Sequence, residues 1–256
     1  MKIRHKIINM ITAIIFLAGM FSVIPLTAVA YGTYGSLTYN TYDSDGDGVY
    51  DYLTIASCAQ PVTEVEIPAE IDGVPVTEIQ QYAFGGCNNL KNVIIPDRVV
   101  KIGKYAFYDC RSLKEITIPE SVASIDNCAF KNCSVLETVL IKNPECEIYD
   151  SADTIFNNLI FDEETGEVFN CFNGTIYGYE NSTAQAYAEK YGYNFKLFVQ
   201  GDISKNDLID LYDAIEVVKY IMKIRTFTET DKQFADFTGN DAVDLYDAIE
   251  IARTLI

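Results

Sequence analysis

Residues 79–96 read IQQYAFGGCNNLKNVIIP, and the pattern returns as IGKYAFYDCRSLKEITIP at 102–119 and as IDNCAFKNCSVLETVLIK at 125–142. The three stretches share an isoleucine, an Ala-Phe pair, a cysteine and a leucine at fixed positions. A constant period of this kind is typical of a solenoid, in which each repeat is one structural unit that buries its apolar edge against its neighbours. The sequence therefore predicts stacked repeats through the middle of the chain.

Within each repeat, the segment after the shared leucine alternates as a strand with one buried face does. In the first copy we expect Leu90, Val93 and Ile95 to point inward. The residues between them point outward, and over successive strands they form a candidate face for a protein or glycan ligand. This face comprises Thr63, Glu64, Glu66, Lys91, Asn92, Ile94, Lys114, Glu115, Thr117, Glu137, Thr138 and Leu140.

The chain has seven cysteines, an odd number that cannot form a complete set of disulfides within one chain. Cys87, Cys110 and Cys133 occupy one position of the repeat, which favours a column of small, buried thiols. Because adjacent turns of a solenoid lie close together, pairing between turns is the alternative.

The repeated motif resembles the BspA-like (TpLRR) leucine-rich repeats over about residues 60–160. An earlier turn at 62–68 has the same strand pattern and is followed by an insertion near 71–75, whereas residues 142–172 fit the pattern poorly and are interpreted as a degraded repeat. Residues 175–193 depart from the motif and predict a closing unit, a short strand and then a helix that ends at Gly192. Terminal repeats are expected to depart in this way, because their outer side faces water.

The first thirty residues have the composition of a secretory signal peptide. Lys2, Arg4 and Lys6 precede an apolar stretch, and the small residues Ala28 and Ala30 predict cleavage after Ala30. A retained membrane anchor is the alternative. After cleavage no long apolar run remains, so we expect a secreted protein with no membrane segment.

Residues 31–60 are interpreted as an N-terminal cap with strands near 37–39 and 52–55. Between them lies DSDGDGVYD, which has Asp43, Asp45, Asp47 and Asp51 at positions 1, 3, 5 and 9 of a calcium loop, but Thr54 at the position of the last acidic ligand. Asp-Gly pairs also favour tight turns. We interpret the segment as a polar turn, with a third calcium ion at Asp43–Asp51 as the alternative.

After Val199 the chain contains a duplication, because the heptad Asp-Leu-Tyr-Asp-Ala-Ile-Glu occurs at 210–216 and again at 244–250. Each copy predicts a loop with oxygen donors at the positions that calcium loops use, followed by a helix. We expect these helices at about 211–223 and 245–256. The candidate ligands are Asp202, Ser204, Asn206, the Leu208 carbonyl, Asp210 and Asp213 in the first copy, and Asp236, Thr238, Asn240, the Ala242 carbonyl, Asp244 and Asp247 in the second.

The pair of loops and helices resembles a type I dockerin over residues 200–256. The resemblance implies two Ca2+ ions and a cohesin domain of a cellulosome-type scaffold as the partner. The positions that contact cohesin in dockerins correspond here to Leu211, Tyr212 and Lys219 in the first copy and to Leu245, Tyr246 and Arg253 in the second. Both copies depart from the family at loop position 6, where Asp207 and Asp241 replace glycine. A helical hairpin with solvated acidic caps is the alternative.

The fold class expected from these segments is α+β, a leucine-rich-repeat solenoid (61–198) followed by a small all-α dockerin with two EF-hand-like loops (199–256). The formal net charge of −18 argues against nucleic acid as a partner. The single histidine, His5, leaves with the signal peptide, so catalysis by a nucleophile–histidine pair is excluded. We expect a non-catalytic component that supports polysaccharide degradation, with an unrecognised polysaccharide-degrading enzyme as the alternative.

Overall fold

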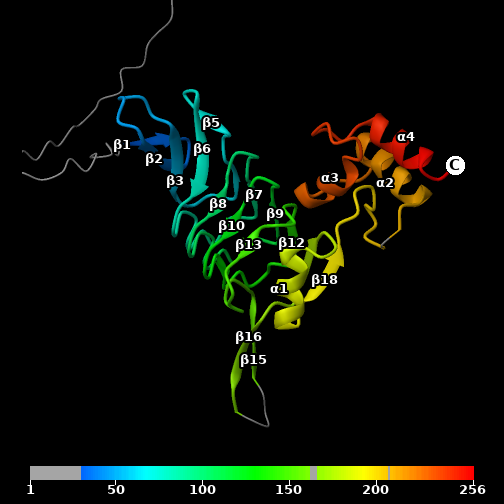
Figure 1. Ribbon diagram of the computed structural model, residues 1–256. Coiled ribbons are helices and arrows are strands. Elements are labelled where there is room, and N and C mark those ends of the chain that lie inside the picture. Colours follow the sequence, from blue (N-terminus) through cyan, green and yellow to red (C-terminus); the bar gives the residue numbers. More distant parts are fainter. Residues whose placement is uncertain (1–29, 162–165, 207) are drawn as a thin grey trace, which may run out of the picture.

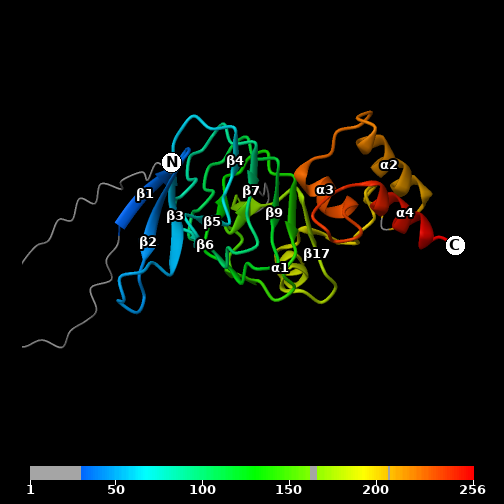
Figure 2. The same cartoon turned by 90° about the horizontal axis from the view of Figure 1, so that it is seen from above.

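The computed structural model describes residues 30–161, 166–206 and 208–256. Most of the expected signal peptide, residues 1–29, lies outside this range. The repeats stack in chain order, and the helical C-terminal segment lies at the far end of the stack from the N-terminal cap in both Figure 1 and Figure 2. A solenoid followed by a helical domain is therefore the observed architecture, as predicted.

The cap is an antiparallel sheet of β1 (Ala30–Tyr34), β2 (Leu37–Tyr42) and β3 (Tyr52–Cys58). Two of these strands were predicted from the sequence. The third strand, β3, also pairs in parallel with β6 (Val74–Ile79), which is the first strand of the same sheet to come from the repeats. The cap thus covers the first repeat and removes an open sheet edge there.

The repeats contribute short parallel strands to two sides of the solenoid. The predicted strands after the shared leucine are β4 (Glu64–Glu66), β7 (Asn92–Ile94), β9 (Glu115–Ile118) and β12 (Thr138–Ile141), and they continue into β17 (Thr175–Gly178) and β18 (Asn194–Leu197). Among these, β4 pairs with β7, and β9, β12, β17 and β18 form one sheet. On the other side β6 is followed by β8 (Lys101–Ile102), β10 (Ser124–Ile125) and β13 (Glu147–Ile148).

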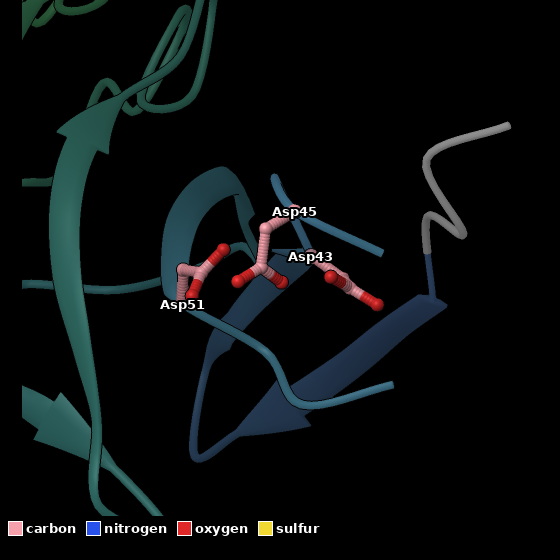
Figure 3. Close-up of side chains that lie close together, drawn as sticks. All are labelled: Asp43, Asp45 and Asp51. Carbon is pink, nitrogen blue, oxygen red and sulfur yellow. The ribbon is translucent and has the colours of Figure 1, made fainter. Parts of the chain in front are cut away.

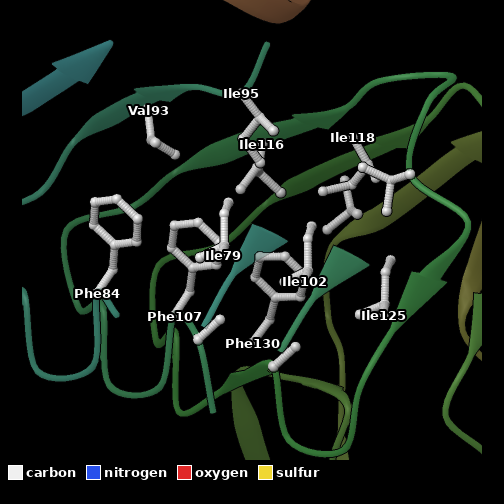
Figure 4. Packing of buried hydrophobic residues seen from close by; sticks show 14 of the residues in the cluster. Ile79, Phe84, Val93, Ile95, Ile102, Phe107, Ile116, Ile118, Ile125 and Phe130 are labelled. Atoms are coloured by element: carbon white, nitrogen blue, oxygen red, sulfur yellow. The ribbon is translucent and has the colours of Figure 1, made fainter. Parts of the chain in front are cut away.

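The interior is built from columns of identical residues, as Figure 4 shows. The rings of Phe84 and Phe107 stack with centroids 4.9 Å apart, and those of Phe107 and Phe130 stack at 5.3 Å. All three are fully buried. Each phenylalanine ring is therefore covered by the ring of a neighbouring turn, as expected for repeats that are stabilised by their neighbours.

The cysteine column runs beside the phenylalanines. The Cys110 thiol donates to the Phe84 carbonyl oxygen at 3.2 Å, and the Cys133 thiol makes the equivalent bond to Phe107 at 3.1 Å. Burial raises the pKa of Cys110 to about 12 and also raises that of Cys133. All seven cysteines are free thiols, so the column packs and donates hydrogen bonds without cross-linking the turns.

Two segments interrupt the regular repeat. The insertion forms a hairpin between β5 (Glu70–Ile71) and β6, whose turn residues Asp72 and Gly73 have φ of 53° and 84°. Positive φ at both central residues is the requirement of the tight turn that Asp-Gly favours. The second interruption lies within the predicted degraded repeat, where β11 (Phe130–Lys131) pairs with β14 (Ile155–Phe156) and β15 (Asn158–Phe161) forms an antiparallel hairpin with β16 (Val168–Cys171) that projects from the stack in Figure 1.

The closing unit has the predicted form. After β17, helix α1 (Thr183–Tyr191) begins at its N-cap Ser182 and ends at Gly192, whose φ of 69° is the left-handed conformation that glycine adopts without strain. The chain then adds β18 to the sheet, which the sequence pattern did not predict. The C-terminal segment holds α2 (Leu211–Ile221), α3 (Glu229–Ala235) and α4 (Leu245–Arg253). Among the described residues, no helix has the length and hydropathy needed to span a membrane.

Candidate calcium loops and docking face

The candidate site consists of two loops, each of which leads directly into a helix. Residues 202–213 form loop 1 and continue into α2, and residues 236–247 form loop 2 and continue into α4. The last residues of each loop are already helical, because calcium-loop position 12 falls in the first turn of the helix. Helices α2 and α4 pack against each other, so the two units form one helical pair.

Loop 1 is closed around its own acidic side chains. Asp202, at position 1, is 1% exposed, and its Oδ1 accepts hydrogen bonds from the Ser204 hydroxyl at 3.2 Å and from the Asn206 backbone N–H at 3.1 Å. Asp213, at position 12, is buried, and its carboxylate accepts from the backbone N–H groups of Ser204 and Asp210, both at 2.9 Å. The side chains at the two ends of the loop thereby converge on Ser204.

Loop 2 repeats this geometry. The Asp247 carboxylate accepts from the backbone N–H groups of Thr238 at 3.0 Å and Asp244 at 2.8 Å, while Asp236 Oδ1 accepts from the Asn240 N–H at 3.0 Å. The backbone hydrogen bonds to the aspartates at positions 1 and 12 are therefore shared by the two loops, whereas the bond from the Ser204 hydroxyl is specific to loop 1. The sequence duplication is also a duplication of conformation.

These residues fit a calcium ion. Each loop presents only oxygen donors at the predicted positions, which is the ligand chemistry that calcium prefers. At position 6 of loop 2, Asp241 has a φ of 63°, so the aspartate adopts the left-handed backbone that the family's glycine would supply. The equivalent Asp207 of loop 1 lies outside the described residues. Because positions 3 and 5 carry neutral donors, we expect weaker affinity than in loops with carboxylates there.

The side chains at position 9 also begin the helices. Asp210 Oδ1 accepts from the Tyr212 N–H at 2.7 Å, and Asp244 Oδ1 makes the same bond to the Tyr246 N–H. Both helices complete a capping box with the aspartate at position 12. An ordered loop therefore fixes where its helix begins and which residues the first turn exposes.

The first two residues of each helix are apolar and exposed. Leu211 is 60% and Tyr212 is 53% exposed, and in the second copy Leu245 is 58% and Tyr246 is 69% exposed. Side chains of this kind gain from being covered by a partner, and tyrosine is enriched at the energetic centres of interfaces. Both Leu-Tyr pairs are thus accessible to a partner, and their contact with cohesin stays a prediction.

Ile215 of α2 and Ile249 of α4 are not among the docking residues expected from the sequence. Ile215 is 42% exposed and Ile249 is 38% exposed, one helical turn after the Leu-Tyr pair of each copy. The buried side of α2 consists instead of smaller residues such as Ala214 and Val217. The two isoleucines extend the apolar face, and their identical place in both copies is the signal that could have identified them.

The cations of the docking face are paired within their helices. Lys219 Nζ lies 2.7 Å from Glu216 Oε1, and Arg253 contacts Glu250 at the same spacing in the second copy. Burial acts to raise the pKa of Glu216, but hydrogen bonds from Lys219 and Arg225 outweigh it and hold the pKa below its ordinary value. Glu216 is thus charged at neutral pH and keeps Lys219 beside the Tyr212 ring, 5.4 Å from its centroid.

The helical segment packs on the sheet of the repeats that contains β9, β12 and β17. Phe234 of α3 is fully buried and meets Tyr177 edge-on at 5.4 Å and Phe198 at 4.8 Å. Leu140 and Tyr177, both from the repeats, belong to the same buried cluster as Ala214 and Ile251 of the helices. Figures 1 and 2 both show α3 between the repeats and the α2–α4 pair.

This contact corrects the ligand face expected from the sequence. Leu140, expected to point to solvent, is fully buried under the helical segment. Glu115 accepts a hydrogen bond from the Thr230 N–H at 3.2 Å, and the Thr117 hydroxyl lies 3.5 Å from that of Thr230. The sequence pattern was wrong here because a strand pattern identifies an outward position without identifying what covers it. The exposed members of the face are Thr63, Glu64, Glu66, Lys91, Ile94, Lys114 and Glu137.

A third acidic group lies in the cap. Asp43, Asp45 and Asp51 bring carboxylate oxygens within 4.8 Å of one another (Figure 3). Among the described residues, these three side chains lie close enough together to hold a metal ion. Asp43 Oδ1 accepts from the Gly46 N–H at 2.7 Å and its Oδ2 from the Gly48 N–H at 2.9 Å. The segment is therefore the turn expected from the sequence. The same turn brings together carboxylates that the alternative, a third calcium ion at Asp43–Asp51, would use.

Two family models match separate parts of the chain. The BspA type leucine rich repeat region, in six copies, matches residues 56–163, and the dockerin type I domain matches residues 200–256. Both are non-catalytic module types, and no enzymatic domain was found. No curated protein matches the sequence.

Several solved structures are similar to the chain at low identity. A leucine-rich repeat protein from Bacteroides capillosus is 25% identical, with a TM-score of 0.39, over 46% of this chain and 92% of that one. One from Bacteroides ovatus is 20% identical, with a TM-score of 0.40, over 65% of this chain and 34% of that one. The T. pallidum leucine-rich repeat protein is 20% identical, with a TM-score of 0.38, over 58% of this chain and 71% of that one. On the two family models, the chain is a BspA-type leucine-rich repeat protein with a C-terminal type I dockerin domain.

Proposed function

We propose that this chain is a secreted, non-catalytic component that docks, in a calcium-dependent manner, onto a cohesin domain of a cellulosome-type scaffold and presents its repeats for protein or glycan binding. In this proposal residues 31–60 form the cap, 61–198 the repeats with their closing unit, and 199–256 the dockerin. The single observation that carries the docking role is the duplicated loop and helix start, which exposes one Leu-Tyr pair in each copy.

Calcium supplies rigidity in this proposal. When bound, the ion replaces repulsion among the loop carboxylates with shared coordination. The chain's own residues position the docking face. Asp210 and Asp244 cap the helices, and the ordered first turns hold Leu211, Tyr212, Leu245 and Tyr246 outward. A preorganised face binds more tightly because less side-chain and backbone freedom is lost on association.

Secretion is supported by the composition of residues 1–30 and by the presence of a dockerin, a module that acts in extracellular assemblies. The exposed part of the repeat face supports a polar ligand. It carries both charge signs, with Lys114 and Glu137 paired at 3.3 Å, and only one large apolar residue, Ile94. This mixture favours a protein partner over a glycan, which would be expected to stack on exposed aromatic rings.

The matching Leu-Tyr pairs predict two interchangeable docking orientations, related by a half-turn. The double substitution Leu211→Ala/Tyr212→Ala should leave cohesin binding within about threefold of wild type, and Leu245→Ala/Tyr246→Ala should do the same, because the other copy still docks. The quadruple variant, which combines both double substitutions, should lose cohesin binding. Surface plasmon resonance of the full chain against purified type I cohesins, with calcium present, measures this. Loss of binding in either double variant alone would rule out the two orientations.

A further inference from the structure

The two calcium loops share their pattern of candidate ligands and their backbone hydrogen bonds but differ in their surroundings. In loop 2, positions 3 to 7, which are residues 238–242, are all exposed, and Asp236 at position 1 is half-buried. In loop 1 the equivalent Asp202 is 1% exposed, Ile203 at position 2 is 2% exposed, and Lys205 at position 4 is half-buried. The repeats lie on the side of loop 1.

Lys205 makes the closest connection between loop 1 and the repeats. Its ammonium group lies 2.9 Å from Asp231 of α3, 5.2 Å from the centre of the Phe234 ring and 5.9 Å from that of Tyr177. Its carbonyl oxygen accepts a hydrogen bond from Lys196 Nζ of β18 at 3.0 Å. Tyr177 and Lys196 stand in register on neighbouring strands, so one row of the sheet touches the loop.

The backbone of loop 1 needs this support more than that of loop 2. Position 4 is left-handed in both loops, with φ of 58° at Lys205 and 69° at Gly239. Glycine adopts this conformation without strain, whereas a residue with a Cβ is strained in it. In loop 1 the contacts of the Lys205 side chain and carbonyl oppose that strain. No such contact is needed at Gly239.

We infer that the repeat domain preorganises loop 1, so that the two loops bind calcium unequally, with loop 1 the tighter site and the last to release its ion. The reason is that a loop already fixed in shape loses less freedom when the ion binds. The Lys205 charge alone would act in the opposite direction by repelling a cation, but Asp231 pairs with it at 2.9 Å. This inference rests on the proposed calcium binding and adds that the solenoid controls it.

The test is calcium titration by calorimetry of the full chain in two backgrounds. Asp236→Ala reports loop 1 alone and Asp202→Ala reports loop 2 alone. We expect loop 1 to bind about tenfold more tightly, equivalent to about 1.4 kcal/mol. Adding Tyr177→Ala, which lies in the repeats and changes no charge, should bring loop 1 to within about threefold of loop 2 and leave loop 2 unchanged.

Two further variants control this comparison. Tyr149→Ala removes an exposed tyrosine that follows β13 in the repeats and should leave both affinities unchanged. Lys205→Ala keeps a Cβ at the left-handed position 4 but removes the ammonium contacts with Asp231, Phe234 and Tyr177, so it should weaken loop 1 although it removes a positive charge. Far-UV circular dichroism confirms that each variant is folded. Equal affinities in the two backgrounds, or a loop 1 affinity that Tyr177→Ala does not change, would overturn the inference while leaving calcium binding intact. The absence of calcium binding in both backgrounds would overturn the proposed function as well.

Discussion

Cys58 differs from the other cysteines because it lies where the cap meets the first repeat. Its N–H donates to the Ala83 carbonyl oxygen at 2.8 Å, and its Sγ lies 3.8 Å from the Ser36 hydroxyl. A hydrogen bond from the Cys87 thiol, opposed by burial and assisted by Ser36, lowers the pKa of Cys58 to about 7. The partner Cys87 has its pKa raised by the same contact.

This difference predicts selective alkylation. As pH rises through about 7, Cys58 should convert to the thiolate, so its rate of modification by iodoacetamide should rise and then level off by about pH 8. Cys110, whose pKa burial raises to about 12, should stay unmodified in the folded protein. Peptide mapping by mass spectrometry after timed alkylation measures both rates. If the Cys58 rate keeps rising steeply above pH 8, the thiol is not perturbed in the way described.

At the scale of single elements, the phenylalanine column stabilises the solenoid. Phe107 lies between Phe84 and Phe130 and is fully buried, so Phe107→Ala should lower the free energy of unfolding of the repeats by about 3–5 kcal/mol. Val135→Ala, at a position 38% exposed in the neighbouring loop, is the matched control and should change it by no more than about 0.5 kcal/mol. Urea denaturation of the full chain gives both values. A loss of less than about 1 kcal/mol for Phe107→Ala would contradict the account of the column.

The sequence predicted best the features that recur over a full stretch of pattern, and it missed very short strands and most elements that occur once. The column of Phe84, Phe107 and Phe130 and the two loop–helix units were identified because the pattern recurs within one chain. Strands β8 and β10 were not predicted, because two residues are too few to show an alternation. The hairpin of β15 and β16 and helix α3 occur once each, so no internal comparison could identify them.

The predicted ligands lie in the two loops that lead into α2 and α4, and their role as ligands stays a prediction; their surroundings could not be predicted from the sequence. Burial of Leu140 and Tyr177 depends on α3, which follows them in the sequence by more than fifty residues. One signal was present, because Leu140 is apolar at a position where the preceding repeat has Thr117. An apolar residue on an outward position can indicate a covering element, although the pattern alone does not say which one.

At the scale of the whole molecule, the dockerin domain is also the last layer of the solenoid. The row of residues from Thr117 through Leu140 and Tyr177 to Lys196 crosses the sheet, and the helical segment covers it. A fragment ending at residue 198 would expose Leu140 and Tyr177 to water, so the full chain is the proper material for binding studies. The packing also directs the Leu-Tyr pairs away from the repeats, since all four side chains remain more than half exposed.

The most direct test of the account is uptake of Ca2+ by the full chain, measured by calorimetry together with far-UV circular dichroism. Wild type should bind one ion in each of the two C-terminal loops and gain helical signal. The double variant Asp202→Ala/Asp236→Ala should lose both the uptake at these loops and the gain. If the double variant binds calcium as wild type does, or if wild type shows neither heat nor added helicity, the calcium-dependent docking role is contradicted.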